Sequence, residues 1–165
     1  LVVLNQGRIE QVAPPEEIYA APANRFVAGF FGAARMNFLD GLLERRADRW
    51  RFVSDEGLAL PVSAASANAV PPGVPRVTLG IRPQDIRFEQ SGERPDGLPA
   101  TVESVQLSDG RYLVRLAANG CRIVVDSPTS VSLKPGDAAS LDFPVERLFL
   151  FDPSGSTLAA PGRRL

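Results

Sequence analysis

The stretch LPATVESVQLSDGRYLVRLAANGCRIVVD, residues 98–126, decides the fold class of this chain. It holds three runs rich in apolar residues, which are separated by Asp109-Gly110 and by Asn119-Gly120. Asp-Gly and Asn-Gly between apolar runs are strong signals for tight hairpins, because both turn residues must reach positive φ. The stretch therefore predicts three consecutive strands joined by two tight turns.

Further short runs of the same kind lie on both sides of this stretch. Many short strands at a spacing of roughly 8–12 residues, with no long helix between them, indicate a closed barrel or a sandwich. We therefore expect a mainly β fold from residue 38 onward, with residues 63–75 as a connector. Leu148 to Phe151 are apolar on both strand faces, which predicts burial on two sides or pairing with a second module. The other expected strands lie in FLDGLLERR (38–46), RWRFV (49–53), LALPV (58–62), RVTLGI (76–81), IRFEQ (86–90), LKPGDAASLDF (133–143) and VERLFLFD (145–152).

The first 32 residues have a different pattern. Residues 1–12 predict a hairpin with a glycine-containing turn, and two short helices follow it. In the second helix, Phe26 and Phe30 are four residues apart, as are Val27 and Phe31, so they would form one apolar stripe. An isolated hairpin is marginally stable in water. We therefore expect this segment to be the edge of a larger domain.

Composition excludes several classes of function. The net charge is −1 with both signs interspersed, which argues against a nucleic-acid or anionic-membrane surface. The chain has no histidine, which removes histidine-based acid–base catalysis, Ser-His triads and nearly all zinc geometries. Cys121 is the only cysteine, so an intrachain disulfide is impossible and a cytosolic compartment fits. No apolar run approaches the roughly 20 residues that span a bilayer.

Four motifs occur in the order expected for one known family. They are VVLNQGRIEQVAPPEEIYAAPANRFVAGFFG (2–32), MNF (36–38), LGIRPQDI (79–86) and LFLFD (148–152). The first resembles the end of the ATPase domain of an ABC-importer ATP-binding subunit of the maltose and carbohydrate type. The other three resemble its transport-associated OB (TOBE) domain, a small barrel. The chain is thus similar to the C-terminal third of such a subunit.

This resemblance implies a domain organisation. Residues 1–32 would be a hairpin-plus-two-helix remnant of the α/β ATPase domain, residues 33–160 an OB-like TOBE domain, and residues 161–165 a frayed tail. The implied function is that of a regulatory and dimerising accessory domain in an importer for carbohydrates.

The resemblance also implies partners and a location. We expect a homodimer, membrane-spanning permease subunits contacted through the missing ATPase domain, and cytosolic regulatory proteins in some family members. The intact subunit would lie peripherally at the cytoplasmic face of the inner membrane.

The nucleotide motifs of the family are absent from these residues. No G-x-x-x-x-G-K-[ST] is present, and Lys134, the only lysine, is followed by Pro135. We therefore expect no catalytic residue, no cofactor and no metal ligand in this fragment, which is not an enzyme. The resemblance implies ATP and Mg²⁺ for the intact subunit, which is expected to be a transport-coupled ATPase.

Four positions depart from the family pattern. Ala13 and Ser108 stand where the family usually or often has glycine, and Gln84 replaces an acidic residue. Phe149 replaces a frequent histidine, which removes a titratable group from the last strand.

Candidate interface and hinge residues lie around these motifs. The phenylalanine stripe either docks a partner or covers the seam between ATPase domain and barrel, and we favour the seam. Asn37 either bonds across the junction or caps exposed backbone. Arg82 either grips a carboxylate or phosphate or, as we favour, fixes a turn by pairing with Asp85. The full set is Phe26, Phe30, Phe31, Met36, Asn37, Phe38, Arg82 and Asp85.

Two alternative functions belong to other classes. The polar stretch SPTSVSLK, residues 127–134, would be the candidate for binding a small oxyanion such as molybdate. Trp50 and Phe52 beside Arg49 and Arg51 superficially resemble a base-stacking platform of a nucleic-acid-binding OB barrel. Such binding needs a sustained positive groove, which the net charge does not supply. We therefore expect no nucleic-acid partner.

Overall fold

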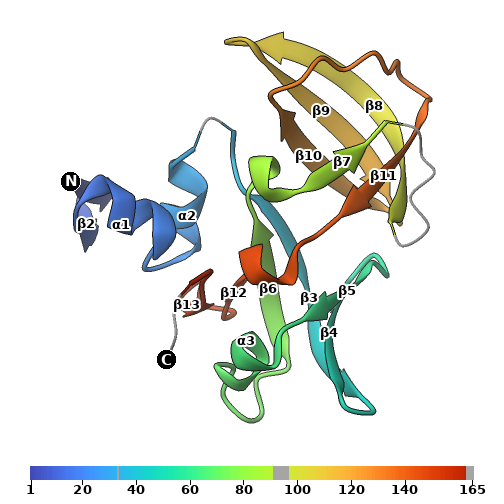
Figure 1. Ribbon diagram of the computed structural model, residues 1–165. Helices are drawn as coiled ribbons and strands as arrows, with labels where there is room; N and C mark the ends of the chain where they lie inside the picture. Colours follow the sequence, from blue (N-terminus) through green and yellow to red (C-terminus); the bar gives the residue numbers. More distant parts are fainter. Residues whose placement is uncertain (33, 91–96, 163–165) are drawn as a thin grey trace.

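The strands predicted in residues 98–126 form, and they belong to a five-stranded antiparallel sheet. The structure, a computed structural model, describes residues 1–32, 34–90 and 97–162. Asp109 and Gly110 have φ of 50° and 75°, and Asn119 and Gly120 have φ of 46° and 79°, as tight hairpin turns require. The sheet has the order β10-β9-β8-β11-β7 and contains β7 (Arg87–Glu89), β8 (Leu98–Ser108), β9 (Arg111–Ala118), β10 (Cys121–Ser127) and β11 (Ala138–Asp142) (Figure 1).

A second, six-stranded sheet contains the predicted strands that lie farther from this stretch in the sequence. Its order is β13-β12-β6-β3-β4-β5, and all neighbouring strands are antiparallel. The chain therefore leaves this sheet after β6, builds the five-stranded sheet, and returns to it at β12. The strands are β3 (Asn37–Arg46), β4 (Arg49–Ser54), β5 (Ala59–Val62), β6 (Arg76–Ile81), β12 (Phe149–Phe151) and β13 (Thr157–Ala159).

Two short 3-10 turns carry the chain between the sheets. The turn η1 (Pro83–Asp85) links β6 to β7, and η2 (Val145–Arg147) links β11 to β12. Pro83 stands at the first position of η1, where its fixed φ suits the turn. This turn separates β6 from β7, which lie in the two runs where strands were expected, 76–81 and 86–90.

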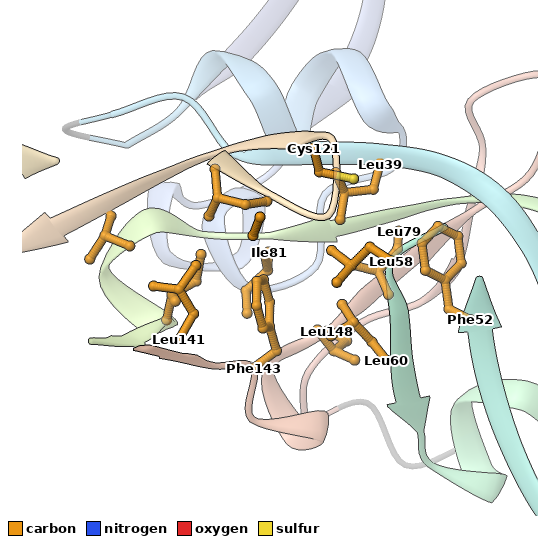
Figure 2. Packing of buried hydrophobic residues seen from close by; sticks show 14 of the residues in the cluster. Leu39, Phe52, Leu58, Leu60, Leu79, Ile81, Cys121, Leu141, Phe143 and Leu148 are labelled. Carbon is orange, nitrogen blue, oxygen red and sulfur yellow. The ribbon is translucent and has the colours of Figure 1, made fainter. Parts of the chain in front are cut away.

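One hydrophobic core lies between the two sheets. Phe52 and Leu79 enter it from the six-stranded sheet, and Ile123 and Leu141 enter it from the five-stranded sheet. Figure 2 shows side chains from both sheets pointing toward one another. Fully burying each side chain of this size stabilises the fold by about 1.5–3 kcal/mol. The prediction of a mainly β, barrel-like fold is confirmed.

Burial on two sides of the last apolar strand is also confirmed. Leu150 faces the shared core, whereas Phe149 and Phe151 lie on the opposite face in a second cluster with Ala28 and Met36. Gly80, opposite Phe149 in β6, leaves the space that these rings fill.

The first 32 residues form a hairpin and two short helices, as predicted. These are β1 (Val2–Asn5), β2 (Arg8–Val12), α1 (Pro15–Ala20) and α2 (Arg25–Phe30). Asn24 caps α2, because its Oδ1 accepts from the backbone N–H of Val27 at 2.9 Å.

The connector at residues 63–75 contains a helix that the sequence pattern did not reveal. It is α3 (Ala64–Asn68), and Ser63 caps it by accepting from Ser66 N at 3.0 Å. Five residues are too few to show a helical period, so only the serine cap signalled it. In the part of the chain that the structure describes, no helix has the length and apolar character that a membrane crossing requires.

Cys121 is buried, as expected of a small apolar side chain. Its Sγ lies 3.3 Å from the Oγ of Ser54. Burial raises the pKa of the Cys121 thiol, which favours the neutral thiol over the nucleophilic thiolate.

Candidate functional site at the junction of the N-terminal segment and the sheet

The N-terminal segment, residues 1–32, packs on the six-stranded sheet through α2. Two neighbouring residues of this helix face opposite ways. Val27 packs with Val3 and Ile18 of the N-terminal segment itself, and Ala28 packs with Met36 and Phe151. The helix therefore joins two apolar clusters that belong to different parts of the chain.

Arg82, at the end of β6, caps both helices of the N-terminal segment. Its Nη2 donates to the carbonyl of Tyr19, in the last turn of α1, at 2.6 Å. Its Nη1 donates to the carbonyl of Phe31, the C-cap of α2, at 2.9 Å. The last carbonyls of a helix have no intrahelical partner, so a cation that binds them is stabilising. One guanidinium thus fixes the C-terminal ends of two helices to the sheet.

The surroundings of Arg82 hold its guanidinium in place. Only 2% of the residue is exposed, and its guanidinium carbon lies 3.6 Å from the centroid of the Tyr19 ring and 5.6 Å from that of Phe149. Gln84 also donates to the hydroxyl of Tyr19. Burial lowers the pKa of Arg82 from its ordinary value, but arginine remains a cation in proteins. Phe149, which replaces a histidine frequent in the resembled family, supplies a ring face to this cation.

A second arginine ties α2 to the sheet from the other side. Arg25 donates to Asp40 Oδ1 at 3.2 Å and to Thr78 Oγ1 at 3.3 Å, and its guanidinium lies 4.8 Å from the Phe38 ring centroid. The Arg25 and Asp40 side chains are 42% and 50% exposed, so this ion pair contributes at most about 1 kcal/mol.

The loop between β12 and β13 adds backbone contacts to the same junction. Arg25 N donates to Gly155 O at 2.7 Å, and Thr157 N donates to Ala23 O at 3.1 Å. The Thr157 hydroxyl donates to Pro22 O at 2.6 Å. Residues 22–25 are therefore held by the C-terminal end of the six-stranded sheet.

The predicted hinge residues Met36, Asn37 and Phe38 lie where the chain enters β3, and two of them belong to the apolar cluster beneath α2. Met36 is buried against Ala28 and Phe149. Phe38 packs on Phe151 with ring centroids 5.8 Å apart. The Asn37 side chain bonds to the backbone of Val124, across the two sheets, and to that of Ile81, rather than to the N-terminal segment.

The phenylalanine stripe divides between buried and exposed positions. Phe31 is partly buried against the Val27 cluster. Phe26 and Phe30 stack on each other at 6.0 Å and are 39% and 67% exposed. Phe26 and Phe30, together with Met36 and Phe38, line a pocket of about 650 Å³. Ala28, rather than Phe26 or Phe30, makes the apolar contact of α2 across the seam.

Asp85 lies in η1 and does not supply the partner that we expected for Arg82. The hydrogen bonds of the Arg82 guanidinium go to the backbone carbonyls of Tyr19 and Phe31 instead. Burial raises the pKa of the Asp85 carboxyl, while Arg147 and Arg82 act in the opposite direction. The Arg82 and Asp85 charges therefore interact electrostatically, but Arg82 forms its hydrogen bonds with the two carbonyls and not with Asp85.

Sequence reasoning missed the partners of Arg82 and the role of Arg25. Tyr19 and Phe31 take part through backbone carbonyls, which no side-chain pattern reveals. Arg25 follows the helix cap Asn24, and only that cap was a local signal. In residues 1–32, 34–90 and 97–162, no cluster of three potential metal-ligating side chains occurs.

The stretch considered for oxyanion binding uses its polar groups internally. The Ser127 hydroxyl donates to Thr129 O at 3.1 Å, and Ser132 N donates to Gln90 Oε1 at 3.1 Å. The backbone N–H of Lys134 donates to Asp137 at 2.7 Å. Phe52, considered for base stacking, is fully buried in the core.

Comparison with known families identifies the β-rich part of the chain. Residues 79–151, from β6 to β12, match the family described as the TOBE domain. These residues form a TOBE domain. Arg82 and Phe149 belong to it, whereas Tyr19 and Phe31 precede it. The Arg82 cap therefore joins the TOBE domain to the N-terminal segment.

Curated relatives extend the similarity beyond the TOBE domain. The chain is 33% identical over 152 residues to the sn-glycerol-3-phosphate import ATP-binding protein UgpC of Salmonella paratyphi A, covering 92% of this chain and 41% of that protein. It is 34% identical over 153 residues to UgpC 1 of Rhizobium johnstonii, covering 92% and 39%. It is 32% identical over 154 residues to the ABC transporter ATP-binding protein y4oS of Sinorhizobium fredii, covering 93% and 39%. The chain thus spans about two fifths of the relatives' length, and the resemblance to the C-terminal part of such subunits is confirmed.

A solved structure shares the fold. The molybdate-bound form of the cytoplasmic molybdate-binding protein ModG superposes with a TM-score of 0.55 at 22% identity, covering 71% of this chain and 96% of ModG. At this identity the likeness concerns the fold alone.

Proposed function

We propose that this chain is the C-terminal regulatory part of the ATP-binding subunit of an ABC importer. The Arg82 cap is the observation that carries the proposal. A buried cation that holds the ends of two helices couples the TOBE domain firmly to the segment before it. Any displacement of that segment is then transmitted to the barrel.

The N-terminal segment is the end of an ATPase domain in this proposal. Its exposed apolar side chains support this, because large apolar side chains concentrated on one short segment suggest a surface that another part of a protein covers. In the intact subunit they would be covered by the rest of that domain. Eight of them fall within the first 30 residues: Leu1, Val2, Leu4, Ile9, Val12, Tyr19, Phe26 and Phe30.

The similarity to ATP-binding subunits supports the proposed role of the whole protein. The upstream part would bind ATP with Mg²⁺, hydrolyse it, and contact the membrane-spanning permease subunits. The protein would then lie peripherally at the cytoplasmic face of the inner membrane. The fragment itself would have no catalytic activity.

We propose a small polyol, sugar or sugar phosphate as the imported solute. The function in the name of UgpC, sn-glycerol-3-phosphate import, supports this class. The resemblance of MNF and GIRPQD to carbohydrate importers points in the same direction.

We further propose that two copies of the chain associate. Obligate homodimer interfaces run to about 2,000 Å² or more and resemble a core cut in half. Exposed Leu42 and Leu107 lie outside the N-terminal segment, so apolar surface is also available on the barrel. Sedimentation velocity at increasing concentration tests this, and a monomer at high concentration would contradict it.

Reading the DNA upstream of the codon for Leu1 tests the main proposal. We expect the reading frame to continue upstream and to encode G-x-x-x-x-G-K-[ST] and the other nucleotide motifs. A start codon immediately ahead of Leu1 would overturn it.

The complete subunit then allows a functional test of the coupling. We expect Arg82→Ala to leave ATP binding intact while uncoupling ATP hydrolysis from regulation. Replacing the exposed Arg122 by alanine serves as the matched control.

Calorimetry with molybdate, tungstate and sulfate tests the alternative function of oxyanion binding. Micromolar binding of one of these anions would favour that function instead.

A further inference from the structure

A groove borders the end of the β3–β4 hairpin, on the face of the sheet opposite α2. It has a volume of about 530 Å³ and is lined by Leu43, Trp50, Ala67, Asn68, Val70 and residues 71–75. Pockets that hold ligands fall in the range of about 300–1,000 Å³. Figure 1 shows α3 and this hairpin at the lower end of the molecule, while the N-terminal segment lies to one side.

The register of the hairpin shows which face carries the groove. Leu43 is opposite Phe52, and Arg45 is opposite Trp50, so these four side chains share the face that continues into the core. Phe149 and Phe151, which α2 covers, lie on the other face of the sheet. The N-terminal segment therefore does not occupy the groove.

The tip of the hairpin carries a local excess of positive charge. Residues 45–49 contain three arginines and one aspartate, whereas the whole chain has a net charge of −1. Arg46 and Arg49 are direct cross-strand partners, and like charges in that position are destabilising. Neither forms an ion pair with any residue that the structure describes.

The third arginine lies beside the groove itself. Arg45 is 6.0 Å from the centroid of the Trp50 ring. Its ion pair with Asp48 is 3.6 Å long, with side chains 59% and 99% exposed, so it is weak and open to exchange. Strand alternation directs Arg46 and Arg49 to the opposite face of the hairpin, but both flank its two-residue turn, so a segment that leaves the groove over the hairpin tip would meet them.

We propose that this groove and the basic tip (Arg45, Arg46 and Arg49) bind an acidic segment of a partner protein. An apolar side chain of the segment lies in the groove against Trp50, and flanking carboxylates pair with the three arginines. Charge complementarity selects this occupant, because carboxylates relieve the repulsion between Arg46 and Arg49. A protein segment fits better than a membrane, since Trp50 forms the wall of a concavity rather than protruding. The inference does not depend on the proposed transport function.

Trp50 is the only tryptophan, so its fluorescence reports occupancy of the groove in the full chain. The probe is the capped peptide Glu-Glu-Leu-Phe-Glu-Glu, which has no tryptophan or tyrosine. We expect a saturable change in emission that weakens as salt screens the ion pairs. Peptides with Lys replacing Glu, or with Ser-Ser replacing Leu-Phe, should give no saturable change. An equal response to either control peptide, or none to the probe, overturns the proposal.

Variants test the two halves of the site separately. Arg46→Ser with Arg49→Ser should weaken binding of the probe by about three- to tenfold. Val74→Glu, at the groove, should weaken it through repulsion. The double variant Arg87→Ser with Arg122→Ser, which removes two exposed arginines of the five-stranded sheet, is the matched control and should bind as the native chain does. Equal affinity of the Arg46/Arg49 variant and the native chain overturns the proposal.

Two further measurements separate other occupants. If phosphatidylserine-containing vesicles bind the chain through the tip arginines while the probe does not, the site belongs to a membrane and the proposal is overturned. If Trp50 emission changes with protein concentration and not with the probe, a second copy occupies the groove, and this also overturns it.

Discussion

The side-chain amide of Asn37 pairs with the backbone of Val124 as a neighbouring strand would. Its Nδ2 donates to Val124 O at 2.8 Å, and Val124 N donates to its Oδ1 at 2.8 Å. Val124 lies in β10, an edge strand of the five-stranded sheet, and Asn37 begins β3 of the six-stranded sheet. One buried carboxamide thus satisfies both backbone groups of an edge residue and joins the two sheets.

Replacing Asn37 by alanine should destabilise the whole barrel. The change leaves the partly buried N–H and C=O of Val124 without these partners, at a cost of up to about 1–3 kcal/mol for each group. We expect a loss of about 2–4 kcal/mol in the free energy of unfolding, measured by urea denaturation. Asn68→Ala, at the exposed end of α3, is the control. Equal stability of the two variants would contradict the role given to Asn37.

Adding a methyl group at Gly80 should destabilise the cluster beneath α2. A Cβ there would lie 2.7 Å from Met36 Sδ and 2.8 Å from Phe151 Cε2, closer than van der Waals contact. We expect Gly80→Ala to cost about 1–3 kcal/mol in thermal or urea unfolding. Met36→Ala should recover part of this loss when combined with Gly80→Ala, because it makes room for the new methyl group. Strict additivity of the two changes would show that the clash is not responsible.

Removing the guanidinium of Arg82 should release the N-terminal segment from the sheet. Hydrogen bonds to charged groups contribute about 1.5–3 kcal/mol each, so we expect Arg82→Ala to lower the free energy of opening of residues 15–31 by about 3 kcal/mol. Amide hydrogen exchange of that segment measures the change. Arg82→Lys should be intermediate, because one ammonium group does not reproduce the planar geometry of two carbonyl contacts. Unchanged protection in Arg82→Ala would rule out the shared cap.

Asp85 and Asp152 should change stability with pH in opposite directions. Burial raises the pKa of Asp85, so the folded protein binds that proton more tightly, and the carboxylate is destabilising above its ordinary pKa. The Ser154 hydroxyl lowers the pKa of Asp152, so that carboxylate is stabilising above its ordinary pKa. This stabilisation is lost as the pH falls through the folded-state pKa.

Urea midpoints of two amide variants between about pH 3 and about pH 7 measure this effect. Asp85→Asn should be more stable than the native chain at neutral pH, and the difference should disappear in acid. Asp152→Asn should be less stable at neutral pH, and that difference should also disappear in acid. The same sign of effect for both variants would contradict the opposite environments of the two carboxyl groups.

Local signals predicted the parts of the fold that depend on local conformation. The turns at Asp109-Gly110 and Asn119-Gly120 formed as expected because positive φ restricts which residues occupy them. The same reasoning missed α3, whose five residues show no period. It also placed Phe26 and Phe30 in one stripe with Val27, which is buried, and Phe31, which is partly buried. A four-residue spacing defines a helix face but not what lies opposite it.

The sequence by itself determined that this chain is built of short antiparallel strands after a helical N-terminal segment, because strand alternation and turn residues are properties of neighbouring positions. Tertiary structure alone decided the partners of Asn37 and Arg82. Val124 is 87 residues from Asn37, and Tyr19 and Phe31 are 63 and 51 residues from Arg82. All three partners contribute backbone atoms, which every residue possesses. Only the packing of the two sheets and two helices brings the particular carbonyl groups within reach of those side chains.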